Sequence, residues 1–223
     1  VGTIFVAIDR YRNPFKMNAP LISTIVLFDN KGSYICSKSI ITKAGEEEEK
    51  ASLLPLLKDC FKKLCSVTRQ KKWKLIVYLE DTGVGTMEYQ LKKNADECRI
   101  AAKWVGAKYV FLTVNKGSHL RLYTGDPTDR LSANRVSSFT AAVRMRDPRQ
   151  ILIVSTEPII SREIVREIGT PKPVLYTIFS RSEDIDLEEV KEDIAKSIIW
   201  LCRHSWVSPT STRLPAPLYF ANK

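Results

Sequence analysis

The chain begins with three strand-like segments before any helical pattern appears, and this order restricts the folds open to it. The segments Thr3–Asp9, Ser23–Asp29 and Tyr34–Ile41 are rich in apolar and β-branched residues, which favour β-strands. The stretch DNKGS (Asp29–Ser33) between the last two segments is typical of a hairpin turn. We therefore expect an antiparallel three-stranded meander at the start of the fold.

Helical and strand patterns alternate after the meander. Ser52 is a candidate cap for a first helix, and Pro55 stands in its first turn, where a missing N–H costs little. The acidic run Gly45–Glu49 then lies in the preceding loop. The elements expected further along are strands at Trp73–Asp81, Lys108–Lys116, Arg149–Thr156 and Pro173–Ser180, a second helix from Met87 to Val105, a short helix at Ile160–Ile168 that ends at Gly169, a long helix that begins at Asp186 with Glu189 in a capping box, and a last helix near the end of the sequence.

A meander followed by helix, strand, helix and strand is the order of a ribonuclease-H-like fold. This α/β fold has a mixed sheet that starts antiparallel, becomes parallel where helices act as crossovers, and is flanked by helices. A length of 223 residues suits one large domain or two small ones, and we take residues 1–223 as one domain. No run of about 18 apolar residues occurs, so we expect no membrane span.

Charge and cysteine content narrow the choice of partners and site types. The formal net charge is +10 and the pI is about 9.4, which favours a polyanionic partner, most simply nucleic acid. A basic surface without a specific ligand is the alternative. The five cysteines are scattered singly without a CxxC pair, which argues against a zinc site and indicates buried thiols in a reducing cytoplasm.

Two acidic residues stand where predicted core strands end. Asp9 follows the apolar run FVAI, and Glu80 comes near the end of WKLIVYLED. In α/β sheets, binding sites form at the carboxyl ends of parallel strands. Asp9 is therefore either an ordinary strand-end residue or the first ligand of a metal site.

Four segments, in the right order, resemble the Argonaute/Piwi family. GTPKPVLYTI (Gly169–Ile178) resembles the family's G-T-x-x-P segment with its following strand, and RLPAPLYFAN (Arg213–Asn222) resembles I-P-A-P-x-Y-Y-A-H. TVNKGSHLRLY (Thr113–Tyr123) is similar to a strand and loop that end in a basic H-x-R-L-F run, and LIVYLED (Leu75–Asp81) takes the place of I-I-Y-R-D-G. The whole resembles a PIWI domain of a prokaryotic or archaeal type, as in a short Argonaute.

The resemblance implies a domain that holds a guide strand paired with its target. Active members cut the target strand with two divalent ions, Mg²⁺ or Mn²⁺. Carried over by position, the four catalytic places fall on Asp9, Glu49, Glu80 (with Asp81 beside it) and Asn222, and an active site would hold metal through Asp9, Glu80 and Asn222. Asn222 is an acceptable neutral oxygen ligand, but Glu at the third place is one methylene longer than Asp, so we expect a weak or inactive nuclease.

The resemblance also indicates residues that contact nucleic acid. Lys116 and Arg121 match basic positions that touch guide phosphates, and ordinary surface charge is the alternative. Packing is an alternative role for Tyr219. The other candidate contacts are His119, Lys172, Ser211 and Arg213.

Three functions stay open at this stage. The first is guide-directed binding with little or no target cleavage, with signalling to an effector protein in host defence. The second is a divalent-metal-dependent endonuclease, and the third is a scaffold for a protein partner, which an exposed apolar patch away from the basic surface would favour. In the family a MID domain captures the guide 5′-phosphate, and we expect it from elsewhere in a longer protein or from another chain.

Overall fold

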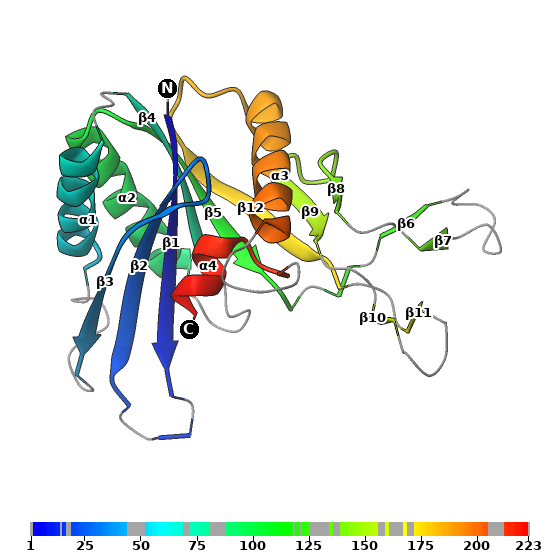
Figure 1. Cartoon of the computed structure of the whole chain (residues 1–223), viewed down its shortest axis with the longest axis horizontal. Coiled ribbons are helices and arrows are strands. Elements are labelled where there is room, and N and C mark those ends of the chain that lie inside the picture. Colours follow the sequence, from blue (N-terminus) through cyan, green and yellow to red (C-terminus); the bar gives the residue numbers. More distant parts are fainter. Residues whose placement is uncertain are drawn as a thin grey trace.

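The computed structural model of the chain describes most of its residues (Figure 1). The described residues are 2–13, 15–16, 19–43, 52–68, 72–80, 88–117, 119–120, 122–124, 134–135, 139–155, 159–160, 167–168, 172–204 and 212–222.

One eight-stranded mixed sheet forms the centre of the molecule. The strands, in sheet order, are β3 (Tyr34–Thr42), β2 (Leu21–Asp29), β1 (Gly2–Arg12), β4 (Trp73–Glu80), β5 (Lys108–Asn115), β12 (Val174–Arg181), β9 (Gln150–Val154) and β8 (Thr140–Ala142). β1, β2 and β3 form the predicted antiparallel meander, and β1, β4 and β5 are parallel. The ribonuclease-H-like order of the sequence is therefore confirmed, and β12, β9 and β8 return to antiparallel pairing.

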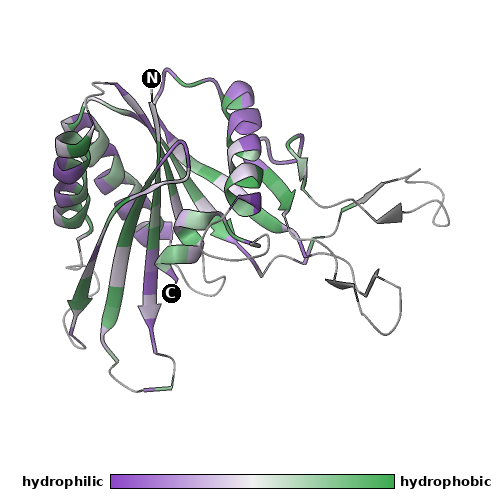
Figure 2. Cartoon of the chain, viewed as in Figure 1, coloured by the Kyte–Doolittle hydropathy of each residue, from purple (hydrophilic) through white to green (hydrophobic). Residues whose placement is uncertain are grey.

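Helices cover both faces of the sheet. α1 (Leu54–Val67) and α2 (Glu88–Trp104) lie on one face, and α3 (Leu187–Arg203) and α4 (Ala216–Ala221) lie on the other (Figure 1). Two apolar cores result, one on each side of the sheet. Figure 2 shows green, apolar residues along the central strands, with purple, polar residues on the outer turns of the helices.

The alternation of side chains along β1 divides these residues between the two cores. Phe5 and Ala7 belong to the core under α3 and α4, whereas Ile4, Val6 and Ile8 belong to the core under α1 and α2. Successive side chains of a strand point to opposite faces. The same alternation decides which face of the sheet each polar residue at a strand end occupies.

The hairpin between β2 and β3 forms as the sequence predicts. Asp29 accepts hydrogen bonds through Oδ1 from the backbone N–H groups of Lys31 and Ser33, both at 2.8 Å. Gly32 has φ of 76°, a conformation that glycine adopts without a Cβ clash.

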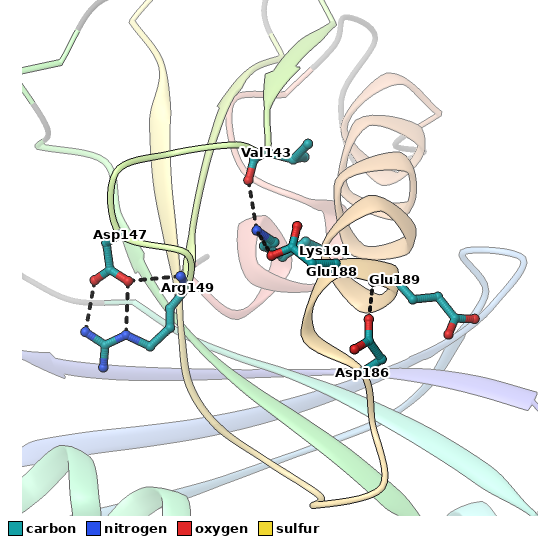
Figure 3. A network of polar contacts seen from close by, with 7 residues as sticks. All are labelled: Val143, Asp147, Arg149, Asp186, Glu188, Glu189 and Lys191. Carbon is teal, nitrogen blue, oxygen red and sulfur yellow. Dashed lines mark hydrogen bonds and ion pairs between the residues drawn. The ribbon is translucent and has the colours of Figure 1, made fainter.

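Asp186 caps the N-terminus of α3 as predicted, through the first of the two bonds of a capping box. Asp186 is its N-cap and accepts a hydrogen bond from the backbone N–H of Glu189 at 2.9 Å (Figure 3). One turn on, Lys191 has a side chain only 2% exposed and donates to the carbonyl oxygen of Val143 at 3.1 Å and to Glu188 at 2.8 Å. The bond to Val143 connects α3 with the segment after β8, and the bond to Glu188 balances the charge of the buried ammonium within α3.

Three sequence predictions need correction. The strand β1 does not end at Asp9 but continues to Arg12, paired with β2 alone. The predicted helix at Ile160–Ile168 is wrong at its described ends: β10 (Ile159–Ile160) pairs antiparallel with β11 (Glu167–Ile168), in keeping with the β-branched isoleucines there. A second pair of two-residue strands joins β6 (Tyr123–Thr124) to β7 (Asn134–Arg135).

The third correction concerns the start of α1. Its N-cap is Leu53 rather than Ser52, whose hydroxyl accepts from the N–H of Leu54 at 3.2 Å. The buried N–H of Leu53 donates to Oε2 of Glu97, on α2, at 2.6 Å.

Among the helices of the described ranges, none combines the length and apolar character needed to cross a membrane.

Candidate functional site

Strand register brings Asp9 and Glu80 together. Ile8 pairs with Leu79 in the parallel ladder between β1 and β4, so Asp9 and Glu80 are the next residues on neighbouring strands. Asp9 shares the face of Ala7, and Glu80 shares the face of Tyr78, both in the core under α3 and α4. β4 ends at Glu80, so the two carboxylates lie at the end of the parallel ladder between β1 and β4. This is the carboxyl-end location that the sequence predicted.

Lys116 reaches the same place from β5. Glu80 pairs with Val114 in the parallel ladder between β4 and β5, and Lys116 lies two residues beyond Val114, on the same face. Its Nζ forms an ion pair with Oε1 of Glu80, whose side chain is 8% exposed.

Asn222 closes the site from the C-terminal segment. α4 begins after Pro215 and buries Leu218 and Ala221 against the sheet. α4 lies against β1 and β2, and the ring centroid of Phe220 is 6.1 Å from that of Phe28 and 5.5 Å from that of Tyr34. Asn222, at the C-cap of α4, then donates from Nδ2 to Oε2 of Glu80 at 2.5 Å.

The electrostatics of the pair favour a proton on Asp9. Burial first, and then the negative charge of Glu80, raise the pKa of Asp9 from 3.8 to about 6. The backbone N–H of Arg10 and the ammonium of Lys116 act in the opposite direction and lower the pKa. Near neutral pH, Asp9 is mostly ionised, but its charge is costlier than that of an exposed carboxylate.

The described part of this site does not fit a divalent metal ion. A hard cation such as Mg²⁺ needs several oxygen ligands, but one oxygen of Glu80 is bound by an ammonium and the other by an amide N–H. No group of three or more His, Cys, Asp and Glu suited to a metal occurs among the residues that the structure describes. Glu49 and Asp81, which the sequence assigned to the second and third catalytic places, lie outside the described residues.

Arg213 lies beside the site but is engaged with backbone. Its Nη2 donates to the carbonyl oxygens of Lys116 at 2.5 Å and Pro173 at 3.3 Å, and its Nε donates to the carbonyl oxygen of Lys172 at 3.3 Å. Arg213 thus joins the turn after β5 to the start of β12. The guanidinium therefore has a structural role, and its contact with a phosphate stays a prediction.

Of the five other predicted nucleic-acid contacts, the structure describes three. Lys172 and His119 are exposed, and Tyr219 is partly buried against the core under α3 and α4. Arg121 and Ser211 lie outside the described residues.

Sequence reasoning missed one role, that of Lys116 as the partner of Glu80. The signal was present in the strand pattern, because Leu112, Val114 and Lys116 occupy alternate positions of one strand and its extension. The resemblance assigned Lys116 to a phosphate, and the register of β4 against β5 was not available from the sequence.

Comparisons with known proteins agree with this geometry. The chain has the same fold as Marinitoga piezophila Argonaute in complex with 5′ OH guide RNA (TM-score 0.60, 16% identity, 99% of this chain and 29% of that chain). It also resembles Aquifex aeolicus Argonaute (TM-score 0.64, 14% identity, 99% of this chain and 27% of that chain). A third similar structure is the C-terminal lobe of a budding yeast Argonaute (TM-score 0.66, 14% identity, 99% of this chain and 45% of that chain).

The chain thus spans less than half the length of each of these structures. No curated protein matches it in sequence. A family model, described as Piwi domain, matches residues 1–223. The chain, with its meander, its paired acidic residues at the strand ends and its closing C-terminal helix, has this match over its whole length. It therefore belongs to the Piwi domain family.

Proposed function

We propose that this Piwi domain binds a guide strand paired with its target and cuts the target weakly or not at all. The observation that carries the proposal is the environment of Glu80, whose two carboxylate oxygens are bound by Lys116 and Asn222. A carboxylate with both oxygens on nitrogen donors is poorly placed to share a metal ion with Asp9. Guide-dependent nucleic-acid binding is the general property that the Piwi family supports.

The charge of the chain supports the binding half of the proposal. A net charge of +10 favours a polyanion, because neutralised phosphates release their counterions. One structure with the same fold is Marinitoga piezophila Argonaute with 5′ OH guide RNA and target DNA (18% identity). We further propose that a MID domain, in the same protein or another chain, holds the guide 5′ end, and that an effector protein reads the bound duplex in host defence.

Fluorescence anisotropy with a labelled guide–target duplex tests the binding. We expect the dissociation constant in Mg²⁺ to agree with that in EDTA within about twofold, and binding to weaken steeply with salt. Lys172→Ala should weaken binding of all sequences alike and reduce the salt slope by about 1, as expected for one phosphate contact. The matched control is Lys62→Ala on α1, an exposed lysine on the other face. Binding that vanishes in EDTA, or that ignores salt, would overturn the proposal.

An endonuclease is the second candidate, and the Asp9–Glu80 pair favours it. Two neighbouring carboxylates, one with a raised pKa, are typical of catalytic sites. The assay for this candidate is target cleavage in Mn²⁺.

A protein-binding role is the third candidate, and α2 supports it. Tyr89, Ile100 and Trp104 are 60%, 46% and 49% exposed, and their spacing of 11 and 4 residues places them along one side of the helix. α2 covers the face of the sheet opposite Glu80. If this stripe serves a protein, Trp104→Ser should leave the affinity for the guide–target duplex unchanged, whereas a loss of duplex affinity would assign the stripe to nucleic acid.

A further inference from the structure

We infer that Lys116 is a built-in counter-ion that stands where a divalent cation would otherwise bridge Glu80 and Asp9. The inference rests on the proposed function, because it gives the physical reason for weak or absent cleavage. Lys116 therefore excludes the metal ion and balances the carboxylate pair in its place.

The position of Lys116 is fixed by its backbone. Its carbonyl oxygen accepts from Nη2 of Arg213 at 2.5 Å, and the N–H of the next residue, Gly117, donates to Oδ1 of Asn115 at 2.8 Å. These two contacts hold the turn after β5 on both sides of Lys116. When its ammonium binds a carboxylate, a lysine on a fixed turn loses less backbone entropy than one on a mobile loop.

The ion pair joins a buried carboxylate to a lysine whose side chain is 46% exposed. The side chain of Glu80 is 8% exposed, so its charge interacts in a medium that screens less than water does. Its second oxygen is bound by Asn222, which leaves few lone pairs free for another ligand. Charge-assisted hydrogen bonds of this type are about twice as strong as neutral ones.

A divalent ion and Lys116 compete for the carboxylate of Glu80. An ion that bridges Asp9 and Glu80 must bind an oxygen of Glu80, and Lys116 and Asn222 already contact both of these oxygens. The ammonium would then have to leave, and its positive charge would repel the incoming ion. Removal of the charge at residue 116 should therefore open the pair to a divalent cation.

The test is a titration of the full chain with Mn²⁺ in the absence of nucleic acid. Electron paramagnetic resonance of the free ion measures the binding. We expect Lys116→Met to bind Mn²⁺ about tenfold more tightly than the natural protein, equivalent to about 1.4 kcal/mol. Lys116→Arg keeps the charge and should bind as weakly as the natural protein. Addition of Glu80→Gln to Lys116→Met should abolish the gain, and Lys62→Met, on the exposed side of α1, is the control for general loss of positive charge.

A second readout covers poor folding of the variant. Without metal, Lys116→Met leaves two carboxylates without their cation, and Mn²⁺ should raise its melting temperature while leaving that of the natural protein unchanged. Lys116→Ala, which likewise leaves Glu80 without a donor from residue 116, replaces it if Lys116→Met does not fold, with the same expected gain.

Equal Mn²⁺ affinity in the natural protein, Lys116→Arg and the uncharged variants would overturn the inference. Because no guide or target is present in this measurement, its failure is distinct from a failure of duplex binding in EDTA, which bears on the proposed function instead.

Discussion

At the scale of single residues, the role of Asp9 depends on the charges around it. Its carboxylate lies on the face of the sheet that α3 and α4 cover, beside the carboxylate of Glu80. Burial and, second, the negative charge of Glu80 together raise the pKa of Asp9 to about 6. The folded protein therefore holds a proton on Asp9 at pH values where the unfolded chain has already lost it.

This raised pKa predicts a pH-dependent gain of stability in Asp9→Asn. The protonated carboxyl contributes stability below about pH 4, and that contribution is lost as the pH rises through about 6. A rise from 3.8 to about 6 corresponds to about 3 kcal/mol at most, and solvent around the half-buried group reduces this to about 1–2 kcal/mol. Urea unfolding should show Asp9→Asn more stable than the natural protein at pH 7.5 and no different at pH 3.5.

The control for this prediction is Asp59→Asn on the exposed side of α1, where Asp59 pairs with Lys62. Its stability relative to the natural protein should change little with pH. If Asp9→Asn gained nothing at pH 7.5, the ammonium of Lys116 would already compensate the burial of Asp9.

At the scale of secondary-structure elements, residues 212–222 connect the outer sheet to the carboxylate pair. Arg213 holds three carbonyl groups near the ends of β5 and β12, and α4 positions Asn222 on Glu80. Thr212 strengthens the same segment by donating through Oγ1 to the carbonyl oxygen of Leu214 at 2.6 Å. The segment works as a structural clamp around Lys116 and Glu80.

We predict that Arg213→Lys destabilises the protein by about 1–2 kcal/mol, because a single ammonium cannot reproduce the geometry of a guanidinium that donates to three carbonyls. Urea unfolding measures the loss, with Arg99→Lys on α2 as the control, since Arg99 forms an exposed pair with Asp96. If Arg213 acted only as a positive charge for phosphate, Arg213→Lys would retain both stability and duplex affinity.

A second element-scale prediction concerns the contact between α1 and α2. Glu97, 8% exposed, accepts from the buried N–H of Leu53 at the N-terminus of α1, where a negative charge also favours the helix dipole. Glu97→Ala leaves this N–H without an acceptor, and we expect a loss of about 1–3 kcal/mol. Glu97→Gln keeps an acceptor oxygen and should lose less.

Asp96→Ala, an exposed neighbour of Glu97 on α2, is the control and should change the free energy of unfolding little. Equal losses in Glu97→Ala and Asp96→Ala would show that the contact with Leu53 contributes nothing specific.

The elements themselves were largely predictable from the sequence, because their signals are local. Strand and helix periodicity located all the strands of the meander, β4, β5, β9 and β12, and Asp186 marked the start of α3. The cap of α1 was not predictable, because Glu97 lies 44 residues beyond Leu53. Ser52, the local candidate, was the natural but wrong choice.

The candidate site was predictable only in part. The resemblance placed Asp9, Glu80 and Asn222 together, and the structure brings them to one face of the sheet. The pairing of Lys116 with Glu80 depends on the register between β4 and β5, which rests on long-range packing. The engagement of Arg213 with carbonyls of β12 and the β5 turn likewise depends on tertiary contacts.

At the scale of the whole molecule, the two faces of the sheet differ in the polarity of their residues. The face under α1 and α2 is a continuous apolar core, whereas the face under α3 and α4 ends in the Asp9–Glu80–Lys116 cluster. The net charge of +10 belongs to the whole chain and favours a polyanionic partner at long range. In the proposed function, this charge attracts the duplex, while the carboxylate pair is already balanced by a lysine.

The most direct measurement of this account is cleavage of a labelled target strand. The natural protein, Asp9→Ala and Lys116→Met are each incubated with a 5′-phosphorylated guide and its complementary target, in Mn²⁺ and in EDTA, and the bound fraction is measured in the same samples. We predict that the natural protein binds the duplex equally in both conditions and leaves the target intact or nearly so. A rapid Mn²⁺-dependent cut by the natural protein that disappears in Asp9→Ala would contradict the account and establish Asp9 as a ligand of a working metal site.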